Sequence, residues 1–352
     1  MPKNVAVALS GGVDSSVSAY LLKKKGYNVI GFYMYNWNNK DCMWEDIRDA
    51  MLISVKLNIP FYVLDFRKKY KVKVINYMVN GYKKGLTPNP DIICNKEIKF
   101  GIFLKKTLEL NVDYIATGHY AKIIKDKRYN YYRLFEGNDK IKDQSYFLCR
   151  LNQYQLSKSL FPLGNLTKKK VRKIALKLNF YNANKKDSQG LCFVGKINLV
   201  NFLKKRIKTK LGDIIYIDNN NKYKKIGTHL GSYYFTIGQR KHLNVSGQKC
   251  PLYLLKKNIK QNIIYVSKKN HIDLYKKTIF IKKNTIHWIV KPKKNELIVM
   301  SKIRYNITKQ KALLKIKKEG VLVKFYKNQF AITPGQFIVW YFNNELIGSG
   351  II

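Results

Sequence analysis

The first 120 residues alternate short apolar runs with segments in which apolar residues recur at helical spacing. Apolar runs that predict strands lie at residues 5–9, 29–36, 61–66 and 113–118. Segments 13–25 and 41–57 have the spacing of amphipathic helices, and Gly26 ends the first of them. Strands that alternate with helices are typical of α/β proteins, so this region predicts a mostly parallel sheet covered by helices.

The pattern changes twice toward the carboxyl end. Residues 143–203 have a mostly helical pattern, clearest at 167–179. After about Arg206 the chain has short β-branched and aromatic runs separated by Asn and Gly, at residues 213–217, 252–255, 263–266, 321–325 and 337–342. Such runs predict one or two small β-barrels. We therefore expect an α/β catalytic domain with a helical extension, a small central β-rich domain and a carboxyl-terminal β-barrel, at residues 1–203, 204–270 and 271–352.

Length and composition limit the class of protein. The chain has 352 residues, more than the roughly 250–300 that one hydrophobic core usually supports. No charge-free apolar run approaches the ~20 residues of a membrane helix, and the amino-terminal apolar stretch is too short for a signal peptide. We therefore expect a cytoplasmic protein with no membrane partner. The five cysteines, which form no CxxC pair, argue against a disulfide framework or a zinc site: Cys42, Cys94, Cys149, Cys192 and Cys250.

The charge of the chain is strongly basic. Lys and Arg number 68 against 21 acidic residues, which gives a formal net charge of +47. Lysines that neutralise phosphates supply much of the affinity of proteins for nucleic acid, so a polyanionic partner is one explanation. The other is codon bias, because only nine of the basic residues are Arg and the chain is also rich in Asn, Ile and Tyr. Charge alone therefore leaves RNA binding open.

The sharpest motif is SGGVDSS at residues 10–16, between a predicted strand and a predicted helix. Gly11 and Gly12 allow the backbone to approach a phosphate, while the hydroxyls and the helix-start N–H groups can donate to its oxygens. Asp14 could hold a magnesium ion that bridges phosphates. The alternative, a glycine turn with an ordinary helix cap, fits the length and placement of the motif less well. The motif resembles the SGGxDS loop of the ATP pyrophosphatases.

Two cysteines lie in segments that contain proline or glycine at several positions. Cys94 belongs to TPNPDIICNKEIKF at 87–100, where a proline-rich loop enters a helix, and the helix dipole and nearby Lys96 would favour its thiolate. Cys192 lies in the glycine-flanked loop 187–195. Two thiols on separate loops could meet over one substrate, as disulfide-coupled sulfur transfer requires. From chemistry alone, two unrelated buried cysteines are the commoner case.

These segments and several others, in the same order, resemble those of the bacterial tRNA-specific 2-thiouridylases over essentially the whole chain. The further motifs are GxxMxNW at 31–37, ATGHY at 116–120, KDQSYFL at 142–148, FPLG at 161–164, YFTIGQRK at 234–241, RY at 304–305 and TPGQ at 333–336. Several long motifs together are far more specific than one. The chain departs from the family pattern at Gln189 and His242, neither of which touches a proposed reacting atom.

The resemblance implies an adenine-nucleotide α-hydrolase-like (Rossmann-like) catalytic domain with ATP and Mg²⁺ as cofactors. It implies that ATP binds to Ser10, Gly11, Gly12, Val13, Asp14, Ser15, Ser16, Met34 and Gly118. No dedicated metal site is expected, because Mg²⁺ would be held through the ATP phosphates and through Asp14. Cys94 is similar in place to the family's nucleophile and Cys192 to its persulfide carrier, with a Cys94–Cys192 disulfide left by the reaction. Asp91 would assist proton transfer or orient the base.

The resemblance also implies the partners. The substrate would be the wobble uridine of a tRNA anticodon loop, activated by adenylation of its carbon-2 oxygen, and a cysteine desulfurase or sulfur-relay protein would donate the sulfur. Residues implied to contact tRNA are Asn89, Pro90, Asp91, His119, Lys142, Asp143, Gln144, Arg304, Tyr305 and Gln336. Each has a plainer alternative: His119 as a structural histidine, residues 142–144 as a solvated turn, Met34 as core filling.

Two rival functions use the same features. Another adenylating amidotransferase or synthetase with an SGGxDS loop would use ammonia or an amine and need no cysteine pair. A basic RNA-binding protein that keeps the nucleotide loop as a relic would need no catalysis at all. The tRNA species, the identity of the sulfur donor and the oligomeric state are open at this level.

Overall fold

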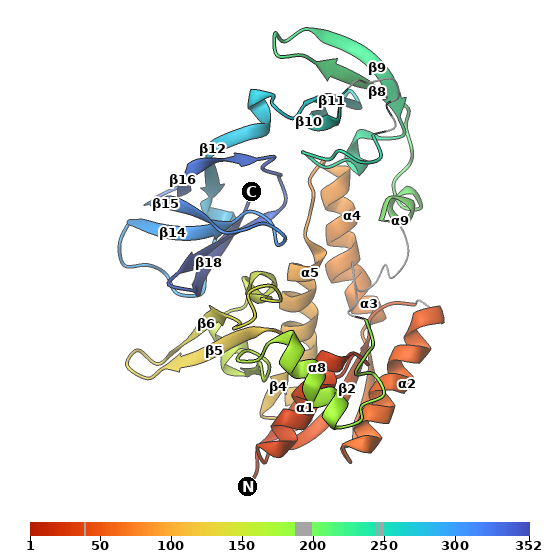
Figure 1. Ribbon diagram of the computed structural model, residues 1–352, viewed down its shortest axis with the longest axis vertical. Helices are drawn as coiled ribbons and strands as arrows, with labels where there is room; N and C mark the ends of the chain where they lie inside the picture. The colour runs from red at the N-terminus through yellow and green to blue at the C-terminus, as the bar shows by residue number, and fades with distance from the viewer. Residues whose placement is uncertain (39, 187–198, 244, 246–249) are drawn as a thin grey trace.

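A computed structural model describes residues 1–38, 40–186, 199–243, 245 and 250–352. Figure 1 shows an amino-terminal α/β layer at one end of the long axis and the β8–β11 sheet at the other, with the carboxyl-terminal sheet beside the long helices between them. Among the described residues, no helix is long and apolar enough to cross a membrane.

The amino-terminal sheet is five-stranded and parallel, in the order β3-β2-β1-β4-β7. Its strands are β1 Asn4–Ala8, β2 Asn28–Tyr35, β3 Phe61–Asp65, β4 Tyr114–Ala116 and β7 Ser159–Leu160. The central strand β1 is buried on both faces, with Val5, Ala6 and Val7 fully inaccessible, because helices cover the sheet on both sides. Helices α1 Val13–Lys24 and α2 Lys40–Lys56 connect the first strands. The predicted parallel α/β sheet and its first four strands are confirmed.

Within residues 143–203, the described stretches 143–186 and 199–203 are less helical than predicted. They contain α7 Gln153–Ser157, α8 Lys168–Lys177, the start of α9 Leu199–Lys204 and a 3₁₀ turn Ser145–Leu148. They also contain β7, which pairs with β4 and closes the sheet. The helix predicted at 167–179 is confirmed, but a two-residue strand has no alternation for a sequence pattern to detect.

Two long helices cross the middle of the molecule (Figure 1). The first runs from α3 Arg67–Tyr70 through a π-helical segment, Lys71–Ile75, into α4 Asn76–Lys83. The second runs from α5 Pro90–Ile93 through a π-helical segment, Cys94–Phe103, into α6 Leu104–Leu108. The side-chain amide of Gln155 anchors the second helix, donating to the carbonyls of Lys96 at 3.1 Å and Phe100 at 2.8 Å. π-helical turns are rare and often occur at functional sites.

A hairpin from the amino-terminal part of the chain joins the carboxyl-terminal sheet. Strands β5 Ala121–Asp126 and β6 Tyr131–Glu136 pair with each other, and β6 pairs with β18. This nine-stranded sheet has the order β12-β16-β15-β14-β17-β18-β6-β5, with β13 beside β18. Its other strands are β12 Tyr275–Lys282, β13 His287–Trp288, β14 Glu296–Lys302, β15 Gln310–Lys317, β16 Gly320–Phe330, β17 Phe337–Phe342 and β18 Glu345–Ile351. The hairpin lies within predicted domain 1–203 in sequence, but its hydrogen bonds extend another sheet.

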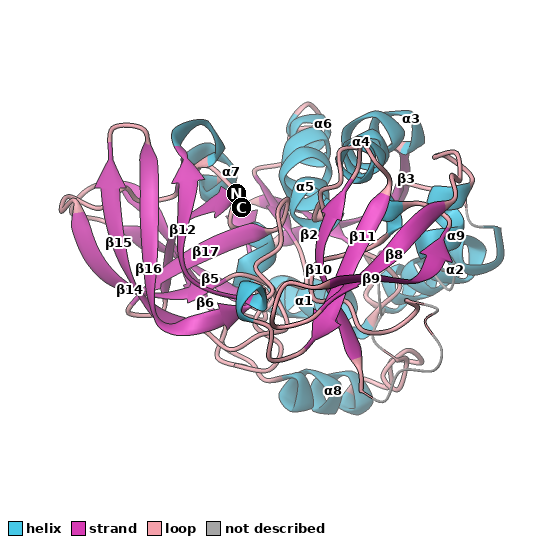
Figure 2. Cartoon of the chain, turned by 90° about the horizontal axis from the view of Figure 1, so that it is seen from above, coloured by secondary structure: helices cyan, strands magenta, loops and turns pink. Residues whose placement is uncertain are grey.

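The central sheet has four strands in the order β10-β11-β8-β9 (Figure 2). They are β8 Gly212–Ile217, β9 Tyr223–His229, β10 Leu252–Asn258 and β11 Ile263–Lys268. Short 3₁₀ turns connect the β-rich parts, at Ser232–Tyr234, Ile272–Leu274 and Lys283–Thr285. The β-rich character predicted after Arg206 is confirmed.

Candidate active site

The nucleotide loop 10–16 lies between the end of β1 and the start of α1. Gly11 has a φ of +72°, and a Cβ there would lie 2.7 Å from the carbonyl oxygen of Asp46, so a side chain does not fit. The hydroxyls of Ser15 and Ser16 donate to the Gly12 carbonyl at 2.9 and 3.0 Å. These bonds and the missing Cβ hold the loop in a tight turn at the carboxyl edge of the sheet.

The backbone N–H groups of this loop indicate a binding site for an anion. Within the described part of the chain, the N–H groups of residues 11–15 donate no hydrogen bond, and no side chain caps the start of α1. A helix start with unsatisfied N–H groups attracts negative charge, because the dipole and the donors act together. The geometry therefore agrees with the predicted phosphate cradle.

Asp14 is held by residues distant in sequence. Both of its carboxylate oxygens accept hydrogen bonds from the Lys168 ammonium, at 2.8 and 2.7 Å, and Oδ1 also accepts one from the Tyr120 hydroxyl at 2.7 Å. Lys168 is the first residue of α8, and its side chain is only 12% exposed. Sequence analysis missed Lys168 and Tyr120, because local motifs give no signal for partners this far along the chain.

The residues around Asp14 fit Mg²⁺ only as part of a nucleotide complex. Among the described residues, no three His, Cys, Asp or Glu side chains gather as metal ligands. Asp14 is one carboxylate, and an ammonium group already neutralises it. Mg²⁺ characteristically keeps few protein ligands and binds through substrate phosphates, so this donor set fits an ion that arrives with ATP.

Gly118 brings the end of β4 against the nucleotide loop. A Cβ at Gly118 would lie 2.9 Å from the Cβ of Asp14 and 3.0 Å from the backbone nitrogen of Ser15. Its predicted place beside the nucleotide therefore depends on the absence of a side chain. Met34 lies near the carboxyl end of β2, half-buried against the main core, so it stands at the same edge of the sheet.

His119 follows Gly118 and faces the second long helix. Its Nδ1 lies 2.7 Å from the hydroxyl of Thr117, and its ring packs 5.9 Å from Phe100 and 5.8 Å from Phe161. Burial lowers the pKa of His119 well below its usual value, so the ring is neutral near pH 7. A neutral, enclosed imidazole positions its neighbours; its contact with tRNA stays a prediction.

Cys94 lies one turn into the second long helix and is 6% exposed. The helix predicted after the proline-rich loop is present. Asn89 caps it by accepting from the Ile92 N–H at 3.2 Å, and Pro90 occupies the first turn. Lys96, expected to favour the thiolate, instead places its ammonium 3.1 Å from the carboxylate of Glu97. The effect of Lys96 and of the helix start on the Cys94 thiol stays a prediction.

Lys99 is a cation that sequence analysis missed. Burial raises the pKa of Asp91 to about 6, and the charge of Lys99 acts in the opposite direction. The same charge lowers the pKa of His119 after the larger effect of burial, so Lys99 lies close enough to act on both groups. Lys99 lies within the π-helical segment Cys94–Phe103. Its effect on Asp91 and His119 depends on how the chain folds, so helical periodicity gave no signal.

Three predicted tRNA contacts lie on a connected polar network beside the nucleotide loop. The Asp143 carboxylate is 4% exposed and accepts from the Gly137 N–H at 3.0 Å and the Ser145 hydroxyl at 2.9 Å. Gln144 accepts from the backbone N–H of Tyr120, whose hydroxyl binds Asp14. Lys142 precedes them and is half-buried. Asp143 shapes its own loop in this structure, so direct contact with RNA stays a prediction.

The predicted contacts in the carboxyl-terminal part hold segments together. Arg304 donates to the Ala331 carbonyl and to the Thr333 hydroxyl, the latter at 2.5 Å. Gln336 donates to the Thr87 carbonyl at 2.7 Å, and so ties this part to the loop before Asn89. Tyr305 packs its ring 4.3 Å from that of Phe147. These residues surround the segment that precedes Cys94, and their contacts with tRNA stay predictions.

Cys192 and its loop lie outside the described residues, so the Cys94–Cys192 pairing stays a prediction. Among the described residues no disulfide is present. Cys149 is buried, and burial raises the pKa of its thiol to about 12, which leaves it unreactive near pH 7. Cys250 is exposed on the central β-rich part.

Comparisons with known proteins cover the whole chain. Residues 3–196 match the family described as the tRNA methyl transferase HUP domain, 200–268 its PRC-barrel domain, and 277–352 the aminomethyltransferase beta-barrel domain. These matches confirm a HUP-type parallel α/β domain followed by β-barrel domains. A 4-thiouridine synthetase solved with RNA and ATP is 14% identical, covers 58% of this chain and 50% of its own, and has a TM-score of 0.37, which adds nothing to the assignment.

Full-length relatives are much closer in sequence. The tRNA-specific 2-thiouridylase of Karelsulcia muelleri (strain GWSS) is 52% identical over 99% of this chain and 98% of its own. The enzyme of the same name from Flavobacterium johnsoniae is 46% identical over 99% and 100%, and that from Mycoplasma mycoides subsp. mycoides is 45% identical over 100% and 99%. The domain names refer to methyl transfer, whereas the relatives that align from end to end are thiouridylases.

Proposed function

The chain belongs to the tRNA-specific 2-thiouridylase family, and from this premise we propose that it uses ATP to replace the carbon-2 oxygen of a tRNA uridine with sulfur. One observation carries the proposal: the residues after β4 contact both the nucleotide loop and the helix that holds Cys94. Gly118 packs against the nucleotide loop, and the next residue, His119, packs against the helix that holds Cys94. ATP and the thiol would therefore meet in one cleft.

Activation of the uridine comes first. Carbon 2 of uracil is a poor electrophile with a poor leaving group, so its oxygen would attack the α-phosphate of ATP and pyrophosphate would leave. The N–H groups of residues 11–15 would stabilise the negative charge that develops on the phosphates, because they are already oriented. Lys168 would add a cation at the same place. Bound Mg²⁺ would neutralise charge on the departing pyrophosphate.

Sulfur transfer follows on the adenylated base. A sulfur-donor protein would load Cys192 as a persulfide, whose terminal sulfur attacks carbon 2 and expels AMP. The Cys94 thiolate would then attack the Cys192 sulfur of the resulting mixed disulfide. The electron pair of the broken S–S bond goes to the sulfur on carbon 2, which becomes the thiocarbonyl. A Cys94–Cys192 disulfide remains, which a cellular dithiol would reduce.

Asp91 is suited to move the proton in this scheme. It lies one helical turn before Cys94, and burial raises the pKa of its carboxyl to about 6. A general base works best when its pKa is near the operating pH, so this carboxylate is a stronger base than an exposed one and still ionised at pH 7. We propose that Asp91 accepts the proton of the uridine N3 or of the Cys94 thiol.

The RNA partner would be an anticodon loop. A wobble base is unpaired, so it can be turned into a cleft without breaking a duplex. The formal charge of +47 supports a phosphate-rich partner, and much of it lies on the β-rich parts that surround the Cys94 segment. These parts would bind the tRNA body while the loop enters the cleft.

The test is the removal of each thiol. Cys94→Ala and Cys192→Ala should each abolish 2-thiouridine in tRNA, measured by mass spectrometry of digested nucleosides, while tRNA-dependent pyrophosphate release persists in part. Cys149→Ala and Cys250→Ser are the matched controls, because neither thiol is proposed to react, and both should retain thiolation. Full thiolation by either of the first two variants would contradict the scheme.

A further inference from the structure

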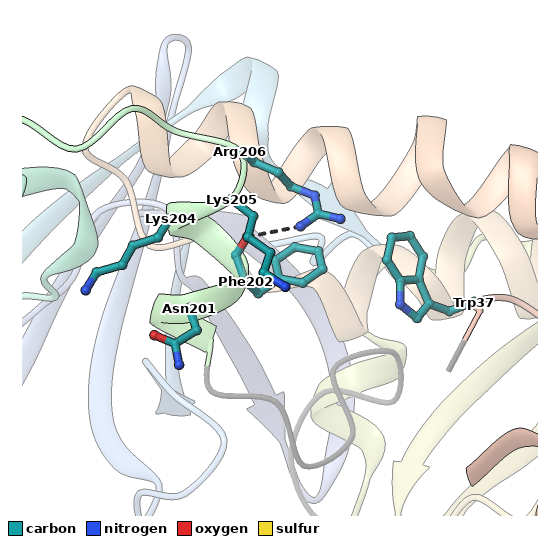
Figure 3. Close-up of a pocket in the computed structure, with 6 residues that line it drawn as sticks. All are labelled: Trp37, Asn201, Phe202, Lys204, Lys205 and Arg206. Atoms are coloured by element: carbon teal, nitrogen blue, oxygen red, sulfur yellow. Dashed lines mark hydrogen bonds between the residues drawn. The ribbon is translucent and has the colours of Figure 1, made fainter. Parts of the chain in front are cut away.

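A cavity of about 650 Å³ lies beside the proposed cleft, between the end of β2 and the end of α9 (Figure 3). Its lining residues are Trp37, Asn201, Phe202, Lys204, Lys205 and Arg206. Trp37 lies two residues after the end of β2, the strand that carries Met34, so the cavity opens at the carboxyl edge of the parallel sheet. Ligands of open α/β sheets bind at this edge.

Arg206 forms the centre of the cavity wall. Its guanidinium lies 3.7 Å from the ring centroid of Phe202 and 5.6 Å from that of Trp37. It also donates to the Phe202 carbonyl at 3.0 Å, which fixes the direction of the side chain. Figure 3 shows Arg206 reaching toward the space between the two rings. Phe202 is only 4% exposed and the guanidinium lies on its ring, so the surface open to a ligand is formed by Arg206 and Trp37. A flat ring system can stack on that surface.

The rim of the cavity is basic. Lys204, Lys205 and Arg206 are consecutive, exposed cations at the end of α9. A ligand that brings negative charge and a flat ring would satisfy both features, and a nucleotide has both.

We infer that this cavity binds one nucleotide of the substrate RNA, with the base stacked on the Arg206 guanidinium beside Trp37 and the phosphates facing Lys204 and Lys205. The inference rests on the proposed function, because it takes the RNA loop that enters the cleft as its ligand. A volume of about 650 Å³ is within the usual size of small-molecule sites and accommodates a nucleotide. The bound nucleotide would be a neighbour of the target uridine, held while that uridine is adenylated.

The experiment measures binding of an anticodon stem-loop RNA whose loop nucleotides are replaced, one at a time, by abasic residues. For the wild-type chain, one position besides the target should weaken binding by about tenfold or more, as loss of one stacked base does. Arg206→Ala and Trp37→Ala should weaken binding of the intact RNA to a similar extent. They should also be insensitive to the abasic change at that one position.

Arg128→Ala is the matched control. Arg128 lies between β5 and β6 with its guanidinium 5.3 Å from the ring of Tyr129, so the substitution also removes one charge and one arginine–aromatic contact. It should leave the abasic profile unchanged. Arg206→Lys keeps the charge without the planar group, and should restore part of the affinity but not the sensitivity to the missing base. Circular dichroism on each variant confirms that the chain is folded.

Two outcomes would overturn the inference. Arg206→Ala and Trp37→Ala variants that are folded and bind every RNA as the wild type does would show that the cavity takes no base. A loss of ATP affinity with unchanged RNA affinity would show that the cavity takes the free nucleotide instead. The proposed function is tested separately, by the thiolation assay. A wild-type chain that makes no 2-thiouridine would contradict the proposed function, whatever its binding profile with abasic RNAs.

Discussion

The nucleotide loop and the Cys94 helix both lie against the end of β4, but they are built in opposite ways. The loop is formed by seven consecutive residues, with a positive-φ glycine, hydroxyls bound to its own backbone and open N–H groups. The Cys94 helix depends on residues that are distant in sequence, such as Gln155, which binds the carbonyls of its π-helical turn. Phosphate binding is therefore a local property of the chain, whereas the environment of the thiol is a property of the fold.

Because of this difference, a substitution near Cys94 should reduce the thiolation rate and leave the affinity for ATP unchanged. Asp91→Asn removes the proposed base, so thiolation should fall by about a hundredfold or more. ATP affinity should stay within about twofold, because residues 10–16 are untouched. Single-turnover thiolation and calorimetric titration with ATP measure the two effects.

The same substitution has a stability signature. The folded pKa of Asp91, about 6, is above the ordinary 3.8, so ionisation is opposed in the folded state, and stability falls as pH rises from about 4 through 6. Asp91→Asn removes that penalty, and the variant should melt at a higher temperature than the wild type at pH 7.5 but not at pH 4. A variant that is less stable at both pH values would show that the carboxyl has a structural role instead.

A substitution beside the nucleotide loop should instead lower the affinity for ATP. Lys168→Ala removes the cation that binds both oxygens of Asp14 and leaves that carboxylate facing the phosphates. ATP affinity should fall by about tenfold to a hundredfold, the usual size for a charge-assisted hydrogen bond. Lys169→Ala, the next residue of α8 and exposed, is the control and should bind ATP normally. Equal ATP affinity in both variants would remove Lys168 from the site.

The smallest expected effect tests the action of the Lys99 charge on Asp91. Lys99 lowers the pKa of Asp91, so Lys99→Met should raise that pKa and move the acid limb of the thiolation rate, near pH 6 in the wild type, to higher pH. Lys99→Arg keeps the charge and should keep the limb in place. Lys96→Met is a second control, because the Lys96 ammonium faces Glu97. A limb that does not move in Lys99→Met would mean that Lys99 does not act on Asp91.

The sequence predicted the parts of the molecule whose signals are local. The parallel strands, the helix that begins after the proline-rich loop at 87–90 and the nucleotide loop each follow from a few adjacent residues, and the structure has them where they were expected. Lys168 and Tyr120 could not be predicted, because they reach Asp14 only after the chain has folded. Lys99 was missed for the same reason, because its charge acts on Asp91 and on the distant His119 only in the folded chain.

The chain passes from the amino-terminal sheet to the carboxyl-terminal sheet and back. This limits where it can be cut into fragments that fold. Strand β6 lies beside β18, the last strand of the protein, and the segment after β6 leads through Gln144 and Tyr120 to Asp14. A fragment cut after residue 203 would keep the hairpin but lose its neighbour, which exposes a row of open backbone groups to other chains. The ATP-binding half is therefore not expected to be an independent, well-behaved unit, and its chemistry belongs to the intact polypeptide.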